Sequence, residues 1–211
     1  ARDCAALAAL AGRDRRLQLH EVDLADAAAI DAFGREAVGR TGALHLLLNC
    51  AGMLHAPGVR PEKALAQLDI DALERVFAVN AFAPVLLARA LLPAFRHGQP
   101  AVLASVSARV GSIGDNALGG WYAYRASKAA QNQFWKTLSI EMRRLNPAAA
   151  CVLLHPGTVD TALSAPFKSG VPAERLFRPE RAARQLLDII AGLQATDSGR
   201  FIAWDGRDIA W

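Results

Sequence analysis

The sequence predicts an α/β protein with a doubly wound parallel sheet in a single domain. Short apolar segments that suit strands alternate with longer amphipathic segments that suit helices, which is the pattern of βαβ units. The chain has 211 residues, 53% of them hydrophobic, so it can bury one large core. Because a domain averages about 150 residues and no linker or repeat interrupts the pattern, we assign residues 1–211 to one domain.

The first half of the chain is predicted to hold two strands and three helices. The segment at 17–22 alternates like a strand, whereas the continuous apolar run at 43–48 suits a strand buried on both faces. Helices are expected near 4–12, at 26–40 and at 71–95, the last two with an Asp cap.

The second half continues the alternation around a polar, glycine-rich loop at 111–120. The predicted strands are at 101–106, 149–154 and 200–204. The predicted helices are at 122–145 and 178–193. Connections of this length imply parallel strands with helices on both faces of the sheet.

Composition and charge argue against several classes of protein. The net charge is +4 and the isoelectric point about 9.3, but the basic residues are scattered, so we expect no nucleic-acid binding. Apolar stretches are interrupted within about a dozen residues, short of the roughly 20 that a membrane helix needs, and we expect no membrane contact. The three cysteines lie far apart and no secretory segment is evident, which favours reduced thiols in the cytoplasm. Neither these cysteines nor the five histidines have metal-binding spacing, so no metal is expected.

Small and polar residues follow the apolar strands, at the edge of the sheet where doubly wound proteins bind ligands. These strand-end residues are Asp23, Asn49, Gly52, Ser105, Ser107, Pro156 and Gly157. Each could belong to an ordinary turn, but together they outline one crevice.

The segment YRASK at 124–128 is the sharpest chemical feature. On a helix, residues four apart share a face, so Tyr124 and Lys128 are expected to point the same way. An adjacent ammonium favours the phenolate form of a tyrosine, so the pair could act as a general acid or base. By itself, such a pair is more often an ordinary surface feature of an amphipathic helix.

Three further motifs accompany YRASK in a fixed order: NCAG at 49–52, VNAFAP at 79–84 and HPGTVDT at 155–161. With these four motifs the chain resembles the short-chain dehydrogenase/reductase family, which has a Rossmann fold, over essentially its whole length. More narrowly, GSIGDN, GGWYAYRASKAA and SGRFIAWDG are similar to the C-factor-like or sniffer-like carbonyl reductase branch.

The resemblance implies an oxidoreductase that uses NADP(H) to transfer a hydride between nicotinamide and a carbonyl or secondary alcohol. It implies that Tyr124 is the general acid or base and that Lys128 lowers the pKa of Tyr124 and binds the nicotinamide ribose. Asn80 is then expected to hold a water that links Lys128 to solvent.

The same resemblance implies three groups of cofactor contacts. The adenine is expected near Asp23 and Leu24. The cofactor is expected to approach the backbone closely at NCAG, and its nicotinamide end is expected at the HPGTVDT motif. The residues concerned in these two motifs are Asn49, Ala51, Gly52, Pro156, Gly157, Val159 and Thr161.

One family position is altered. The family has two consecutive serines after the corresponding strand, the second of which polarises the substrate carbonyl, and here that second place is Ala108. Ser107 and Ser112 are both candidates for the missing role, and the sequence leaves the choice between them open. Without either serine the reaction is expected to be slow, because one oxyanion donor contributes roughly 10² to 10³ in rate.

The start of the family pattern is also missing. The family begins with a strand, a TGxxxGxG loop and a helix, so we expect the first βα unit, about 35 to 45 residues, to be absent from this chain. Arg2 falls at the end of the family's second strand, where an arginine pairs with a 2′-phosphate, and therefore favours NADP over NAD.

A mobile loop at 161–177 is expected to cover a small-molecule carbonyl or alcohol substrate. Its residues Leu163, Phe167, Val171 and Leu176 favour a hydrophobic or aromatic carbonyl. A homodimer or homotetramer is compatible with apolar residues on several sides of the helices at 71–95 and 122–145. An alternative function is a dinucleotide-binding sensor or C-factor-like signalling protein with little turnover.

Overall fold

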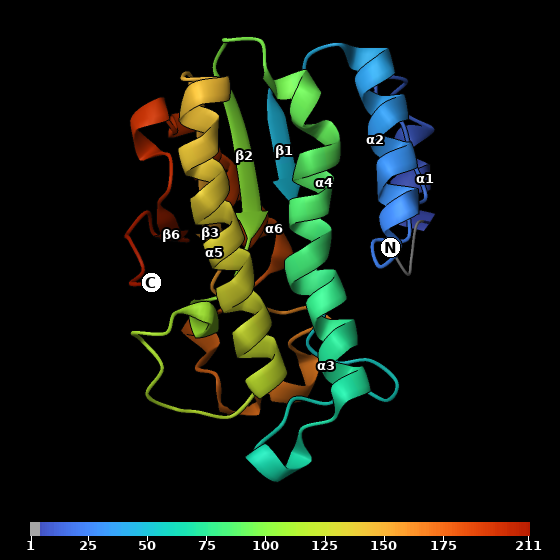
Figure 1. Cartoon of the computed structure of the whole chain (residues 1–211). Coiled ribbons are helices and arrows are strands. Elements are labelled where there is room, and N and C mark those ends of the chain that lie inside the picture. Colours follow the sequence, from blue (N-terminus) through green and yellow to red (C-terminus); the bar gives the residue numbers. More distant parts are fainter. Residues whose placement is uncertain (1–4) are drawn as a thin grey trace.

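A four-stranded parallel sheet lies between helices on both of its faces in the computed structural model, which describes residues 5–211 (Figure 1). The strands are ordered β1 (Leu46–Asn49), β2 (Ala101–Val106), β3 (Ala149–His155) and β6 (Phe201–Ala203). Leu47 pairs with Leu103, which in turn pairs with Cys151 across the centre of the sheet. The predicted doubly wound parallel sheet is confirmed.

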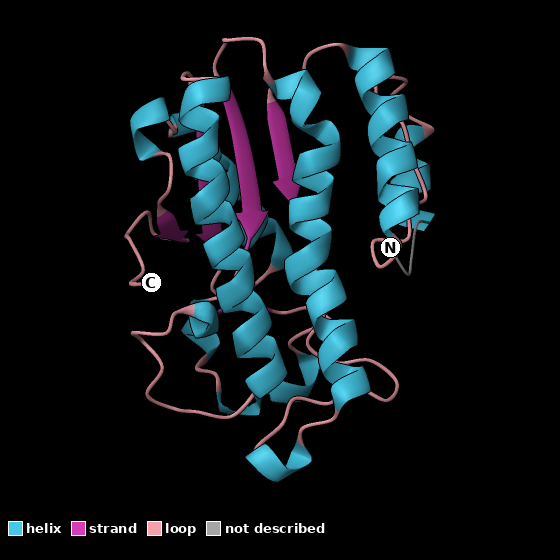
Figure 2. Cartoon of the chain, in the orientation of Figure 1, coloured by secondary structure: helices cyan, strands magenta, loops and turns pink. Residues whose placement is uncertain are grey.

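Two helix layers enclose this sheet (Figure 2). The first face is covered by α4 (Ala83–Leu91) and α5 (Tyr122–Leu145), and α2 (Ala27–Thr41) contacts α4. The opposite face is covered by α6 (Pro179–Gly192). The first core includes Leu103, Trp135, Met142 and Leu153, all at most 1% exposed, whereas the second includes Ala104, Val152, Leu186 and Ile190. The short helix α1 (Ala5–Ala11) precedes α2 in the chain.

The predicted helix at 71–95 is one helical run composed of four segments. They are α3 (Ile70–Phe77), a π-helical turn (Ala78–Phe82), α4 and a 3₁₀ turn (Leu92–Phe95). Asp69 caps the run by accepting a hydrogen bond from Ala72 N at 2.8 Å. By length and composition alone, the 26 residues Ile70–Phe95 could cross a membrane, and an 18-residue stretch within them has a mean hydropathy of 1.7. Their apolar side chains include Ala88, Leu91 and Phe95, which belong to the core of the first face.

The prediction of a strand at 17–22 is wrong. The described residues provide no hydrogen-bonding partner strand for this segment, and Leu17 and Leu19 are exposed. A strand requires a neighbour, so alternation of side chains alone is insufficient. The predicted burial of the 43–48 strand on both faces is also wrong, because Leu46 in β1 is 45% exposed.

A second, two-stranded sheet was not predicted. It pairs β4 (Thr158–Val159) with β5 (Leu176–Phe177), and between them the 3₁₀ turns Ala165–Gly170 and Ala173–Arg175 form most of the predicted loop. This sheet fixes both ends of the loop at the carboxyl edge of the main sheet.

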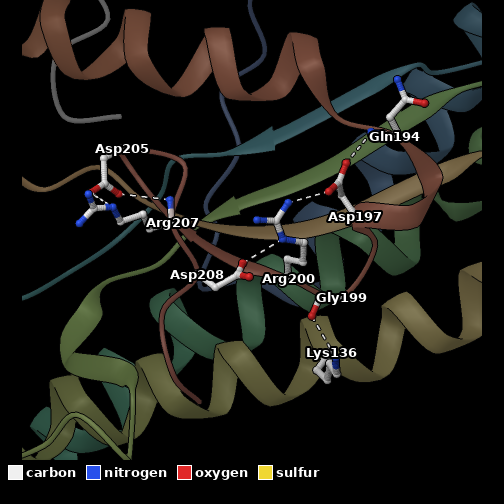
Figure 3. Close-up of polar contacts among 8 residues, drawn as sticks. All are labelled: Lys136, Gln194, Asp197, Gly199, Arg200, Asp205, Arg207 and Asp208. Carbon is white, nitrogen blue, oxygen red and sulfur yellow. Dashed lines mark hydrogen bonds and ion pairs between the residues drawn. The ribbon is translucent and has the colours of Figure 1, made fainter.

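The C-terminal segment is held against β6 by a cluster of ion pairs (Figure 3). Arg200 donates to Asp197 at 2.6 Å and to Asp208 at 2.9 Å, while Ile209 N donates to Phe201 O at 2.8 Å. Lys136 on α5 donates to Gly199 O at 3.0 Å, which joins the cluster to the helix layer.

Candidate active site

A cavity of about 710 Å³ opens at the carboxyl edge of the sheet, where the strand-end motifs were expected to meet. It lies among the loops that follow β1, β2 and β3 and the first turns of α5. Many of the predicted site residues line it: Ala51, Gly52, Ser107, Tyr124, Lys128, Pro156, Gly157, Val159 and Thr161. Four segments that are far apart in the sequence thus form one site.

Tyr124 and Lys128 lie on the buried side of α5, 8% and 3% exposed. The Lys128 ammonium nitrogen is 5.9 Å from the centre of the Tyr124 ring. Burial raises the pKa of Tyr124 to about 12 and lowers the pKa of Lys128 to about 7. Desolvation disfavours both charged forms and sets the direction of both shifts. That Lys128 lowers the pKa of Tyr124 stays a prediction.

Lys128 is anchored beneath the cavity. Its Nζ donates to Val106 O at 3.1 Å and to Gln131 Oε1 at 2.8 Å, and an ammonium has three N–H groups, so one remains for a ligand. Close approach of the loop after β2 depends on Gly111, where a Cβ atom would lie 2.8 Å from Lys128 Cβ. Lys128 is therefore packed against Gly111 at its Cβ atom and hydrogen-bonded at its ammonium group.

A polar network continues from Lys128 across the ends of β1 and β2. Gln131 Nε2 donates to Ser105 Oγ at 2.6 Å, and Asn49 Nδ2 donates to the same oxygen at 2.8 Å. Asn49 is buried, does not line the cavity, and joins the ends of β1 and β2 through this bond. Sequence reasoning missed Gln131, although its spacing of three residues from Lys128 places both on one helical face.

Asn80 lies in the π-helical turn and is fully buried. A Cβ atom at Gly52 would be 3.7 Å from Lys128 Nζ and 3.8 Å from Asn80 Oδ1, so the two polar groups flank the same glycine. Asn80 Nδ2 also donates to Ser127 Oγ at 3.0 Å, which ties this turn to α5. Asn80 Oδ1 and Lys128 Nζ therefore both lie beside Gly52.

The two candidate serines occupy different places. Ser107 and Ala108 line the cavity, whereas Ser112 lines a separate depression on the other side of Val110 and Arg125. Ser107 Oγ donates to Asn132 Oδ1 at 2.6 Å, and Ser112 Oγ accepts from Asp115 N at 3.1 Å. Of the two serines, only Ser107 lines the cavity that contains Tyr124, and its hydroxyl group donates to the buried Asn132.

The HPGTVDT motif makes a tight turn beside the cavity. Gly157 has φ +77°, and a Cβ atom there would lie 2.7 Å from the ring of Phe177. Phe177 packs edge-to-face on Trp204, with 4.8 Å between ring centres. His155, which also lines the cavity, accepts from Arg109 N at 3.4 Å, and burial together with the charge of Arg109 lowers the pKa of His155 to about 4. His155 is therefore neutral near pH 7.

The predicted substrate loop covers the cavity. Leu163, Phe167 and Val171 line it, but the prediction is wrong for Leu176, which is in β5 and outside the cavity lining. A hydrogen bond of 3.0 Å joins His55 Nε2 and Ala162 O, so this loop touches the segment after β1.

The predicted adenine contacts do not join this cavity. Asp23 is exposed and its carboxylate accepts from Ala25 N at 2.9 Å, capping its own turn, and Leu24 follows it. Neither residue lines the cavity, and Arg2 lies outside the described residues. In the described part of the chain there is no cluster of three or more potential metal ligands.

Comparisons with known proteins agree with this geometry. The family model for short chain dehydrogenase matches residues 1–171. C-signal of Myxococcus xanthus is 36% identical over 171 residues, which cover 81% of this chain and 95% of that protein. The 1-hydroxy-2-glutathionyl-2-methyl-3-butene dehydrogenase of Rhodococcus is 35% identical over 160 residues, covering 75% of this chain and 67% of that enzyme.

Two solved structures have the same fold. Carbonyl reductase from chicken fatty liver with NADPH bound has a TM-score of 0.85 at 27% identity, covering 99% of this chain and 85% of that one. Carbonyl reductase Sniffer of D. melanogaster also has a TM-score of 0.85 at 27% identity, covering 100% and 84%. With its matching fold and buried Tyr124–Lys128 pair, the chain belongs to the short-chain dehydrogenase family of oxidoreductases.

Proposed function

We propose that the protein is an NADP(H)-dependent carbonyl reductase in which Tyr124 protonates the substrate oxygen. The observation that carries this proposal is the meeting of Tyr124 and Lys128 with the strand-end glycines Gly52 and Gly157 around one cavity. Hydride addition to a carbonyl carbon creates an alkoxide, and a proton from Tyr124 converts it to the alcohol.

The residues that line the cavity fit the nicotinamide end of a dinucleotide. Gly52 and Gly157 line the cavity just after β1 and β3, and the remaining N–H of Lys128 can donate to a ribose hydroxyl. When bound, the nicotinamide supplies or accepts the hydride. The side chains that line the cavity would hold this group in position.

Proton transfer is assigned to groups on α5 and the π-helical turn. The neutral Tyr124 is the form that can donate, and the ammonium of Lys128 stabilises the phenolate that remains. We place a relay water at Asn80 Oδ1, which shares the Gly52 surface with Lys128 Nζ. Ser107 is the candidate for polarising the carbonyl, because it lines the cavity whereas Ser112 does not.

The specific cofactor and the substrate class belong to the same proposal. NADP(H) is supported by Arg2 in the sequence and by the NADPH in the chicken carbonyl reductase. A hydrophobic or aromatic carbonyl is supported by Leu163, Phe167 and Val171 in the cavity wall.

The test is to titrate the whole protein with NADPH and with NADH and to follow binding by fluorescence. NADPH oxidation is then followed over a panel of aldehydes and ketones. We expect tighter binding of NADPH than NADH, and turnover that Tyr124→Phe reduces by roughly 10² to 10⁴ without loss of NADPH affinity. Turnover that persists in Tyr124→Phe contradicts the assignment.

Ala108 favours a second candidate function, a dinucleotide-binding sensor or signalling protein with little turnover. That candidate predicts NADPH binding without oxidation on any carbonyl of the panel. The same experiment therefore separates the two.

A further inference from the structure

Trp121 has an unusual backbone conformation at the mouth of the cavity. It is the residue immediately before α5, with φ 53° and ψ 47°, and is the only non-glycine residue with positive φ in the described part of the chain. Gly119 and Gly120, just before it, also have positive φ, 65° in each case. Residues other than glycine rarely adopt this left-handed backbone conformation, so surrounding contacts must hold Trp121 in it.

Glu62 provides those contacts from the loop between β1 and α3. Its backbone carbonyl accepts from Trp121 N at 2.5 Å, and its carboxylate accepts from Ala123 N at 3.2 Å. Trp121 offers no side-chain cap to α5, so the Glu62 carboxylate takes that place at the helix N-terminus.

Glu62 is itself buried. The residue is only 4% exposed, and the nearby Val59 packs with Val76 and Ala123 in a small core. Burying a carboxylate costs free energy. Here one carboxylate oxygen accepts a hydrogen bond from the first turn of α5, the helix that carries Tyr124 and Lys128.

The indole held in this way forms part of the cavity wall. Its ring centre lies 6.1 Å from that of Tyr124 and 5.1 Å from that of Phe167, with both pairs edge-to-face. Trp121 and Phe167 both line the cavity. The indole therefore packs against both Tyr124 and the loop at 161–177, which carries Phe167.

We propose that Trp121 is a substrate-specificity residue that selects planar, aromatic carbonyl compounds, and that Glu62 is the residue that positions it. This inference rests on the proposed function, since it concerns the same cavity. An aromatic ring attached to the carbonyl packs against the indole next to Tyr124, whereas a saturated ring of the same size loses the aromatic contact.

The test compares two matched pairs of compounds on the whole protein with NADPH. Turnover is measured for benzaldehyde and cyclohexanecarbaldehyde, and dissociation constants are measured by calorimetry for the unreactive benzamide and cyclohexanecarboxamide. The readout is the ratio of aromatic to saturated compound in kcat/KM or in affinity.

Trp121→Leu is expected to lower this ratio about two- to tenfold, Trp121→Phe to retain most of it, and neither to change NADPH affinity. Glu62→Ala should lower the ratio as Trp121→Leu does, while Glu62→Gln, whose amide oxygen can still accept from Ala123 N, restores it. In the Trp121→Leu background, Glu62→Ala should change nothing further. Should Glu62→Ala fail to fold, Glu62→Met removes the acceptor while keeping volume.

Two exposed residues of α5, Glu141 and Phe134, provide matched controls as Glu141→Ala and Phe134→Leu, which should leave the ratio unchanged. An unchanged ratio in Trp121→Leu overturns the role of Trp121. An equal effect of Glu62→Ala in both backgrounds overturns the positioning role of Glu62. A wild-type protein without turnover contradicts the proposed function, while the amide ratio still decides this inference.

Discussion

Asn80 binds both backbone groups of Met53: its Oδ1 accepts from Met53 N at 2.7 Å, and its Nδ2 donates to Met53 O at 2.8 Å. The residue after the NCAG motif is thereby fastened to the π-helical turn. A buried amide that satisfies two backbone groups contributes to folding as well as to any role in proton transfer.

Replacing Asn80 by Leu should lower the free energy of unfolding by about 1 to 3 kcal/mol, because the Met53 N–H and C=O lose their partners in the interior. Urea denaturation measures this change. Gln133→Ala removes an exposed amide from α5 and should change stability by less than about 0.5 kcal/mol. Equal effects of the two variants would show that the Met53 contacts contribute little.

The buried ammonium of Lys128 predicts a dependence of stability on pH. Its pKa is about 7 in the folded protein and 10.5 ordinarily, so between these values the unfolded chain binds more protons. The free energy of unfolding therefore rises with pH in this window, by at most about 1.4 kcal/mol per unit. Below pH 7 both states are protonated and this contribution is constant.

Lys128→Met should remove that rise. Urea denaturation of both proteins from pH 6.5 to 9.5 gives the difference, in which the contributions of Cys151, Tyr124 and His155 cancel. A wild-type minus variant difference that stays flat across this range would mean that Lys128 keeps an ordinary pKa.

Gly157→Ala should destabilise the protein by at least about 1 to 2 kcal/mol, because alanine is strained at φ +77° and its Cβ would collide with Phe177. We also expect weaker NADPH binding, since the turn lines the cavity. Gly39→Ala is the matched control: it lies in α2 with open space around it and should stabilise by about 0.5 to 1 kcal/mol. Thermal unfolding and NADPH titration of both variants provide the comparison.

Ala108→Ser should raise kcat for carbonyl reduction about tenfold, and by no more than roughly 10², because it adds a hydroxyl donor to the cavity wall. Ala108→Cys has a similar size and a weak donor, and should give little increase. Steady-state kinetics on one aldehyde compares them. If Ala108→Ser has no effect while Ser107→Ala abolishes turnover, Ser107 already supplies the carbonyl contact.

Most elements of the fold could be predicted because each depends on local periodicity. The limits predicted for the strand at 101–106 and the helix at 122–145 coincide with those of β2 and α5. The strand expected at 17–22 failed because a strand exists only with a hydrogen-bonded neighbour, which is a long-range property.

The sequence by itself determined the α/β class, the family and the Tyr124–Lys128 pair, since a helical spacing of four residues fixes a shared face before any tertiary contact forms. Only the tertiary structure decided that Ser107 rather than Ser112 lies in the cavity, that Glu62 reaches the start of α5, and that burial raises the pKa of Tyr124. Each of these depends on segments distant in the chain that meet at one sheet edge, where desolvation and hydrogen bonding are set by packing and not by local sequence.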